Sequence, residues 1–124
     1  MIVGMGIDLV SIDRLAESLQ SEAFKRRVFS ALEIEQCEDA ANSAERFAGK
    51  FAAKEAMMKA IGKGIRQSVW FTQIEVLNQE SGKPGITAHG EAERTLNTLG
   101  VDRVHVSISH TGEMAVAVVI LEAG

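Results

Sequence analysis

Residues 44–61 constrain the fold most strongly, because they predict one long helix that stops at Gly62 and Gly64. Its charged side chains fall on two stripes at about 100° per residue: Arg46, Lys50 and Lys54 on one, and Glu45, Glu55 and Lys59 on the other. Phe, Ala, Met and Ile side chains occupy the sectors between the stripes. A helix with one solvated half would not show this pattern, so we expect a largely buried helix that carries two polar stripes.

The remaining sequence predicts shorter helices around alternating strands. The expected helices cover residues 11–19, 22–29, 31–41 and 91–100, and the expected strands cover residues 2–10, 69–78, 86–90, 103–110 and 114–121. Ser11 and Ser30 are predicted N-caps, and the last two strands are predicted to form a hairpin. We therefore expect a single α+β domain over residues 1–124, with an antiparallel sheet packed on the long helix.

Composition narrows the function classes. The chain of 124 residues has a net charge of −4, which argues against general nucleic-acid binding because that requires a basic surface. The apolar N-terminus lacks a basic leader and contains Asp8, so we expect neither secretion nor membrane insertion. The single cysteine, Cys37, has no metal-ligand spacing around it and fits a reducing cytoplasm.

Each polar stripe of the long helix has two interpretations. Three cations in a row repel one another, and a bound anion such as phosphate would turn that repulsion into binding energy. A solvated basic stripe explains the same residues equally well. Glu55 and Lys59 likewise form the ordinary helix-stabilising pair at i, i+4, worth about 0.2–0.5 kcal/mol.

Asp8 favours the functional interpretation. It interrupts the apolar run MGIDLV, where an unpaired carboxylate would cost several kcal/mol on burial. It requires a cation, a role as a helix N-cap, or a metal ion. If Asp8 faces Glu55, a hard divalent cation such as Mg²⁺ would relieve the repulsion between the two carboxylates.

The segment HVSISHT near the C-terminus is a third candidate site. His110 and Thr111 follow an alternating strand and lie at the predicted hairpin turn. A turn-capping threonine beside an exposed histidine is one interpretation, and an anion contact is the other. Catalysis by a Ser–His pair is less favoured, because adjacent residues on a strand point to opposite faces.

Three motifs in this order resemble the short, trimeric holo-[acyl-carrier-protein] synthase family of 4′-phosphopantetheinyl transferases. They are GMGIDLVSIDR, RFAGKFAAKEAMMKAIGKGI and, after GKP, HVSISHTGEMAVAVVIL, and together they cover nearly the whole chain. The resemblance implies a homotrimer of the 4′-phosphopantetheinyl transferase fold, with active sites at subunit interfaces. It also implies transfer of phosphopantetheine from coenzyme A to a serine of apo acyl carrier protein, with release of 3′,5′-ADP, in fatty acid biosynthesis.

The resemblance assigns roles to the catalytic residues by motif position. Asp8 and Glu55 match the Mg²⁺ ligands, and Lys59 matches the lysine that contacts the pyrophosphate. The Lys59 ammonium would stabilise negative charge on the bridging and leaving oxygens. Either Glu55 or a metal-bound water would accept the proton of the carrier-protein serine.

The resemblance also assigns binding contacts. The 3′-phosphate of coenzyme A would lie near Lys50, where many relatives carry arginine, and would contact His110 and Thr111 at the strand end. Lys54 and Lys59 are the other expected coenzyme A contacts. The acidic helix of the carrier protein would dock near Arg14, and the basic segment containing Lys25, Arg26 and Arg27 could extend that surface. Two other function classes remain open, namely a coenzyme A-binding module without catalysis and a structural trimer whose charges form ion pairs.

Overall fold

The computed structural model describes residues 1–62 and 68–124, which form an α+β fold. The helices are α1 (Ile12–Ser18), α2 (Glu22–Val28), α3 (Ala31–Glu38), α4 (Ser43–Ile61), the short 3₁₀ helix η2 (Phe71–Gln73) and α5 (Gly90–Thr98). The strands are β1 (Ile2–Ser11), β2 (Ile74–Asn78), β3 (Pro84–Ala88), β4 (Arg103–His110) and β5 (Met114–Glu122). None of the helices in the described ranges has the length and apolarity needed to cross a membrane.

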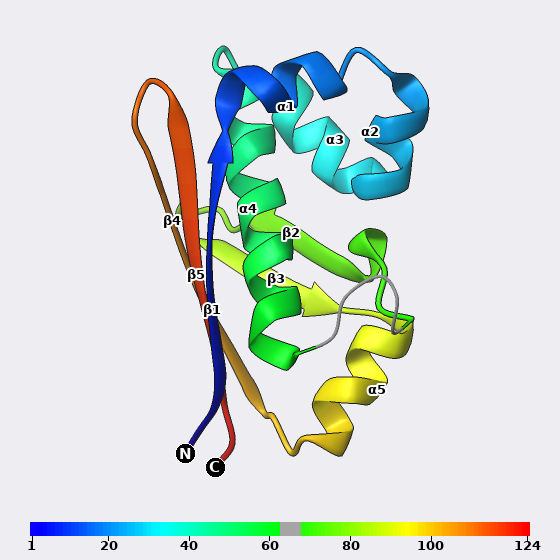
Figure 1. The fold of residues 1–124 in the computed structure, drawn as a ribbon, viewed down its shortest axis with the longest axis vertical. Helices are drawn as coiled ribbons and strands as arrows, with labels where there is room; N and C mark the ends of the chain where they lie inside the picture. Colours follow the sequence, from blue (N-terminus) through cyan, green and yellow to red (C-terminus); the bar gives the residue numbers. More distant parts are fainter. Residues whose placement is uncertain (63–67) are drawn as a thin grey trace.

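The helix α4 is the centre of the fold. It packs against a three-stranded antiparallel sheet in the order β1-β5-β4 and also contacts α1, α3 and β2 (Figure 1). The strands β2 and β3 form a separate antiparallel pair, while α1, α2 and α3 gather around the N-terminal half of α4. The α+β class and the antiparallel sheet on a long central helix are therefore confirmed.

Two glycines of β1 allow α4 to approach the sheet closely. A Cβ atom at Gly4 would collide with the carbonyl oxygen of Ala60, and one at Gly6 with that of Ala56. Side chains alternate between the faces of a strand, so Asp8 points to the same side as both glycines. The glycine spacing in GMGID thus brings the backbone of α4 against β1 and places Asp8 beside that helix.

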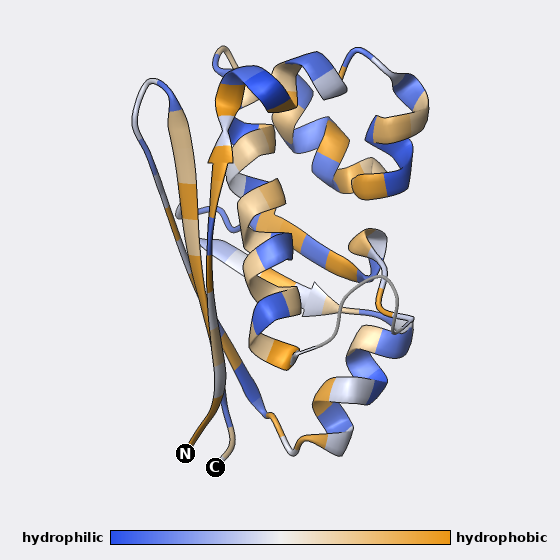
Figure 2. Cartoon of the chain, in the orientation of Figure 1, coloured by the Kyte–Doolittle hydropathy of each residue, from blue (hydrophilic) through white to orange (hydrophobic). Residues whose placement is uncertain are grey.

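The two faces of the larger sheet differ in their burial. The face toward α4 is closed by alternate residues of β5, namely Ala115, Ala117, Val119 and Leu121, all of them fully buried. On the opposite face, Met5, Ile7 and Leu9 of β1 are 59–64% exposed, and Figure 2 shows this strand among the hydrophobic segments. The described chain therefore leaves one apolar sheet face uncovered.

Most predicted elements are confirmed, including the hairpin of β4 and β5 and the N-caps at Ser11 and Ser30. The long helix ends at Gly62, whose φ of 74° is left-handed, and Gly64 lies outside the described residues. The strand predicted over 69–78 is wrong in its first half, where η2 precedes β2. The side chain of Gln73 accepts hydrogen bonds from Trp70 N and Ala92 N, which favours a turn there over an extended strand.

Candidate active site

Asp8 and Glu55 line the same pocket, which has a volume of about 380 Å³. Asp8 comes from β1 and Glu55 from the middle of α4, and Phe24 and Phe51 form an apolar wall beside them. Burial raises the pKa of Glu55, the negative charge of Asp8 raises it further, and the nearby Lys59 opposes both effects. The structure therefore brings two carboxylates into one partly desolvated pocket, as the sequence suggested.

Lys59 supplies the cation that Asp8 requires. Its ammonium donates to Asp8 Oδ1 at 2.9 Å and to the carbonyl oxygen of Ile7 at 3.0 Å. No ion pair joins Lys59 to Glu55 in the described part of the chain, so the expected i, i+4 pair is not formed. Asp8 is not the cap of α1, because Ser11 accepts the hydrogen bond from Arg14 N.

The donors in this pocket fit a hard divalent cation. Mg²⁺ is commonly held by one or two carboxylates and fills its remaining positions with water and substrate phosphates. The described residues contain no group of three or more His, Cys, Asp or Glu side chains arranged around a metal position. Asp8 and Glu55 would therefore be a two-carboxylate site open to phosphate oxygens, in which burial and then the Asp8 charge raise the pKa of Glu55.

The basic stripe on the other side of α4 has a different environment. Lys54 is fully buried, and its ammonium donates to Glu33 Oε1 at 2.9 Å and to the carbonyl oxygens of Phe71 and Ile74. Glu33, itself fully buried, also accepts from Ser30 N and Val76 N. The anion that pairs with Lys54 is thus a carboxylate of the protein. The Lys54 side chain has no exposed surface at which a phosphate could make the contact expected from the sequence.

Lys50 is also engaged by the protein. Its ammonium donates to Val76 O at 2.7 Å, Asn78 Oδ1 at 2.9 Å and Gln36 Oε1 at 3.1 Å. Burial lowers the pKa of Lys50, as it does for Lys54. All three ammonium protons of Lys50 have acceptors, although its side chain forms part of the wall of a second pocket.

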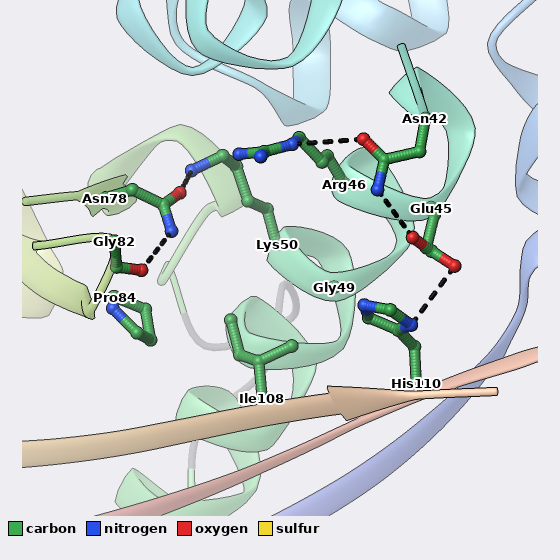
Figure 3. A pocket seen from close by; sticks show the side chains of 10 residues that line it. All are labelled: Asn42, Glu45, Arg46, Gly49, Lys50, Asn78, Gly82, Pro84, Ile108 and His110. Carbon is green, nitrogen blue, oxygen red and sulfur yellow. Dashed lines mark hydrogen bonds and ion pairs between the residues drawn. The ribbon is translucent and has the colours of Figure 1, made fainter. Parts of the chain in front are cut away.

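This second pocket, of about 260 Å³, lies between α4, the end of β4 and the β2–β3 turn (Figure 3). His110 projects into it from β4, and its Nδ1 lies 3.1 Å from Glu45 Oε1. Thr111 serves the hairpin turn, where its hydroxyl accepts from Glu113 N and Met114 N. Both earlier interpretations of this segment therefore have support, since Thr111 caps the turn while His110 faces a polar pocket.

The predicted site residues form two clusters within one chain. Asp8, Glu55 and Lys59 lie beside β1, one edge strand of the larger sheet, while His110 ends β4, the other edge strand. Two strand spacings, roughly 10 Å, separate these edges. The two pockets share no lining residue.

The comparison with known proteins decides the family. A sequence profile described as the 4′-phosphopantetheinyl transferase superfamily matches residues 4–119. The chain belongs to this superfamily.

Its relatives cover nearly the whole chain. The holo-[acyl-carrier-protein] synthase of Koribacter versatilis is 47% identical over 124 residues, which span 98% of this chain and 99% of the relative. The crystal structure of the Bacillus anthracis synthase in complex with CoA (3′,5′-ADP) has a TM-score of 0.82 and 39% identity, covering 100% of this chain and 99% of that one. The Helicobacter pylori synthase in complex with coenzyme A has a TM-score of 0.83 and 32% identity, covering 95% and 99%. The family and fold predicted from the sequence are thus confirmed.

Several residues of this phosphopantetheinyl transferase were missed by the sequence reasoning. Glu33 was not singled out, although its spacing from Ser30 is that of a capping box, which the structure contains. Asn42 was not singled out either, and the contact between Glu45 and His110 joins residues far apart in sequence. Cys37 is a buried free thiol whose pKa burial raises to about 11, in keeping with a bystander.

Proposed function

We propose that this chain is a Mg²⁺-dependent holo-[acyl-carrier-protein] synthase. It transfers 4′-phosphopantetheine from coenzyme A to a serine of apo acyl carrier protein and releases adenosine 3′,5′-bisphosphate, as a step of fatty acid biosynthesis. The relatives with this name span almost the entire chain. The observation that carries the proposal is the pocket in which Asp8 and Glu55 meet beside Lys59.

Asp8 and Glu55 would hold the Mg²⁺ ion. When bound there, the ion supplies a Lewis acid that neutralises the pyrophosphate of coenzyme A. Lys59 lies on the same side of α4 as Glu55. Its ammonium, which contacts Asp8, would instead contact the oxygens that gain negative charge during transfer. Glu55, whose pKa is raised by burial and by Asp8, would be one acceptor for the serine proton, and a water held at the metal site would be the alternative.

The nucleotide end of coenzyme A would occupy the second pocket. His110 projects into it, Thr111 orders the adjoining turn, and Lys50 contributes positive charge from the wall. Lys54 differs from the other predicted contacts, since it is fully buried against Glu33. We therefore propose that Lys54 supports the fold and does not touch coenzyme A.

A homotrimer would complete the active site. Coenzyme A must reach both pockets, yet within one chain they lie by opposite edges of the sheet. The exposed apolar residues Met5, Ile7 and Leu9 lie on the edge strand that carries Asp8. Burial of this face against a second copy would place the His110 pocket of one subunit beside the Asp8 pocket of its neighbour.

The carrier protein would dock on the side of the Asp8 pocket formed by α1 and α2. Arg14 lines this pocket together with Asp8 and Glu55, so an acidic helix bound there would bring its serine near the carboxylates. On α2, Lys25 contacts Glu38 at 2.8 Å and Arg26 contacts Glu22 at 3.3 Å. Arg27 follows them at the end of the helix. Because Arg14 lines the pocket while Lys25 and Arg26 are already paired with acidic residues, we propose Arg14 as the principal contact and Lys25, Arg26 and Arg27 as its extension.

We also propose that residues 1–124 form a single domain that works in the cytoplasm, where the buried free thiol of Cys37 would remain reduced.

Mass spectrometry of apo acyl carrier protein tests the function directly. After incubation with the protein, coenzyme A and Mg²⁺, we expect a gain of one phosphopantetheine mass, and a chelator should abolish it. No mass gain, with coenzyme A still bound, would identify a binding module without catalysis. If the protein shows no mass gain, and coenzyme A does not stabilise it in a thermal melt, the remaining interpretation is a structural trimer. A gain that persists with chelator would contradict the metal site.

A further inference from the structure

Two hydrogen bonds and one ion-pair contact connect side chains across the rim of the second pocket (Figure 3). Arg46 Nε donates to Asn42 Oδ1 at 3.3 Å, and Asn42 Nδ2 donates to Glu45 Oε2 at 2.7 Å. The other oxygen of Glu45 lies 3.1 Å from His110 Nδ1. Four side chains from the first turns of α4 and the end of β4 are therefore linked in one line.

Asn42 is used unusually for its position. It is the N-cap of α4, yet its side chain makes no cap hydrogen bond, and its backbone φ and ψ of −110° and 51° are not extended. The N-caps of α1, α2 and α3 are serines whose hydroxyls all accept a backbone N–H. An asparagine at this position normally caps the helix, so its carboxamide has been diverted to Arg46 and Glu45.

The contact with Glu45 fixes the orientation of His110. A carboxylate on Nδ1 holds the proton on that nitrogen and leaves Nε2 for another partner. Figure 3 shows the second ring nitrogen pointing away from Glu45, on the side of the pocket where Gly49 lies. No hydrogen bond to His110 Nε2 is present among the described residues, and the side chain is 47% exposed.

The charges of this pocket match an anion. Arg46 is exposed on the rim, and the only side-chain hydrogen bond it makes in the described ranges is through Nε, which leaves the terminal nitrogens for a ligand. Lys50, by contrast, donates to three protein acceptors. Both oxygens of Glu45 are already engaged, by Asn42 and His110. The groups that remain for an incoming ligand are therefore the guanidinium nitrogens and the imidazole Nε2.

The family resemblance already implies a contact between His110 and the 3′-phosphate of coenzyme A. We propose that Glu45 and Asn42 are positioning residues for this phosphate-monoester subsite, with Arg46 as its second donor. This inference rests on the proposed function, because coenzyme A carries one phosphate monoester, at its 3′ position. Glu45 orients the imidazole and Asn42 orients the guanidinium, so the two donors converge on a dianionic phosphate. The consequence is selectivity for coenzyme A over 3′-dephospho-coenzyme A.

Transfer kinetics with these two substrates test the proposal. The preference is the ratio of kcat/KM for coenzyme A to kcat/KM for 3′-dephospho-coenzyme A. In Glu45→Ala we expect this preference to fall by about tenfold, through KM, with kcat at saturating coenzyme A nearly unchanged. Glu45→Gln should retain most of the preference, because its amide oxygen can occupy the same place beside His110 Nδ1. Asn42→Ala should lose less than Glu45→Ala, since it removes the contacts to Arg46 and Glu45 but leaves the Glu45 carboxylate beside His110.

Glu93→Ala is the matched control, because Glu93 is an exposed acidic residue in the first turn of α5. It should leave the preference unchanged. An unchanged preference in Glu45→Ala, or equal losses on both substrates, would overturn the positioning role. A rise in preference in both Glu45 variants would show that the carboxylate only repels the phosphate. If the unmodified protein neither transfers nor binds coenzyme A in calorimetry, the proposed function fails as well, which separates the two claims.

Discussion

The two polar stripes of α4 differ most in the environments of Lys54 and Glu55. Lys54 is fully buried and is neutralised by Glu33, with every buried polar side-chain atom of the described residues hydrogen bonded. Asp8 and Glu55 share an open pocket in which Lys59 contacts only one of them. The Lys54–Glu33 pair is electrostatically complete without a ligand, whereas the Asp8–Glu55 pocket has an excess of negative charge. A buried, fully satisfied charge indicates a structural role, and a partly desolvated, unbalanced cluster indicates chemistry.

The Lys54 network also explains how β2 is held. Glu33 accepts a hydrogen bond from Val76 N, and Lys54 donates one to Ile74 O. Further along β2, Lys50 donates to Val76 O, and the Gln36 side chain bonds both backbone groups of Asn78. These side chains take the place of a neighbouring strand along the free edge of β2. An edge covered in this way cannot pair with another chain. The basic stripe therefore attaches β2, and through it the pocket wall, to α4.

Glu55→Gln should have the largest effect. We expect transfer to fall by at least about a thousandfold, because one of the two carboxylates is removed from the proposed metal site. Thermal stability should be unchanged or higher, since the raised pKa of Glu55 shows that its charge is unfavourable in the folded protein.

Asp8→Asn should also abolish transfer while the protein stays folded. Steady-state transfer assays and a thermal melt measure both quantities, and full activity at ordinary Mg²⁺ in either variant would break the distinction between the stripes.

Lys54→Met should show the reverse pattern. We expect a loss of about 3–5 kcal/mol in the free energy of unfolding, because the buried Glu33 carboxylate loses its cation. Adding Glu33→Gln should recover part of that loss. Urea denaturation measures the change, with Arg94→Met as control, since its ion pair with Glu91 is exposed and worth less than about 1 kcal/mol. An equally small change in Lys54→Met would remove its structural role.

Lys59→Ala sharpens the assignment within the catalytic stripe. We expect kcat to fall by about a hundredfold and the KM for coenzyme A to change by less than about threefold. The reason is that the ammonium now contacts Asp8 and a backbone carbonyl, so its substrate contact would develop mainly during transfer. Initial-rate measurements at varied coenzyme A separate the two constants. A change confined to KM would assign Lys59 to ground-state binding.

The smallest effect concerns pH and a group outside both stripes. The hydrogen bond from Ser30, followed by that from His89, lowers the pKa of Glu75. The unfolded chain then binds more protons than the folded one as pH falls below about 4.5, so stability decreases on the acid side. Glu75→Gln should reduce this decrease by about 1 kcal/mol or less. Urea midpoints between about pH 5 and pH 3 test this, and parallel curves for both proteins would contradict it.

Most of the fold was predictable because it depends on local patterns. The glycine stop at Gly62, the serine caps and the alternation in β5 each carry their own signal in a few residues. The start of β2 was not predictable, since Trp70 and Phe71 have strong strand propensity. There the contacts of Gln73 with Trp70 and Ala92, and of Lys54 with the Phe71 carbonyl, outweigh propensity.

The site was predictable in part. Asp8 was informative because a carboxylate within an apolar strand requires a partner, and its partners proved to be Lys59 and the pocket that it shares with Glu55. Lys54 could not be distinguished from a ligand-binding lysine, because its counter-ion Glu33 lies in another helix. Contacts between segments distant in sequence leave no local pattern, which also explains why the Glu45–His110 contact was missed.

One measurement tests the difference between the two stripes most directly. It is the thermal stabilisation produced by Mg²⁺ together with coenzyme A in the unmodified protein, Glu55→Gln and Lys54→Met. We predict that Lys54→Met melts at a lower temperature but keeps the full ligand-induced shift. Glu55→Gln should melt normally and lose the part of the shift that depends on Mg²⁺. A Mg²⁺-dependent shift that survives in Glu55→Gln and disappears in a folded Lys54→Met would contradict the assignment.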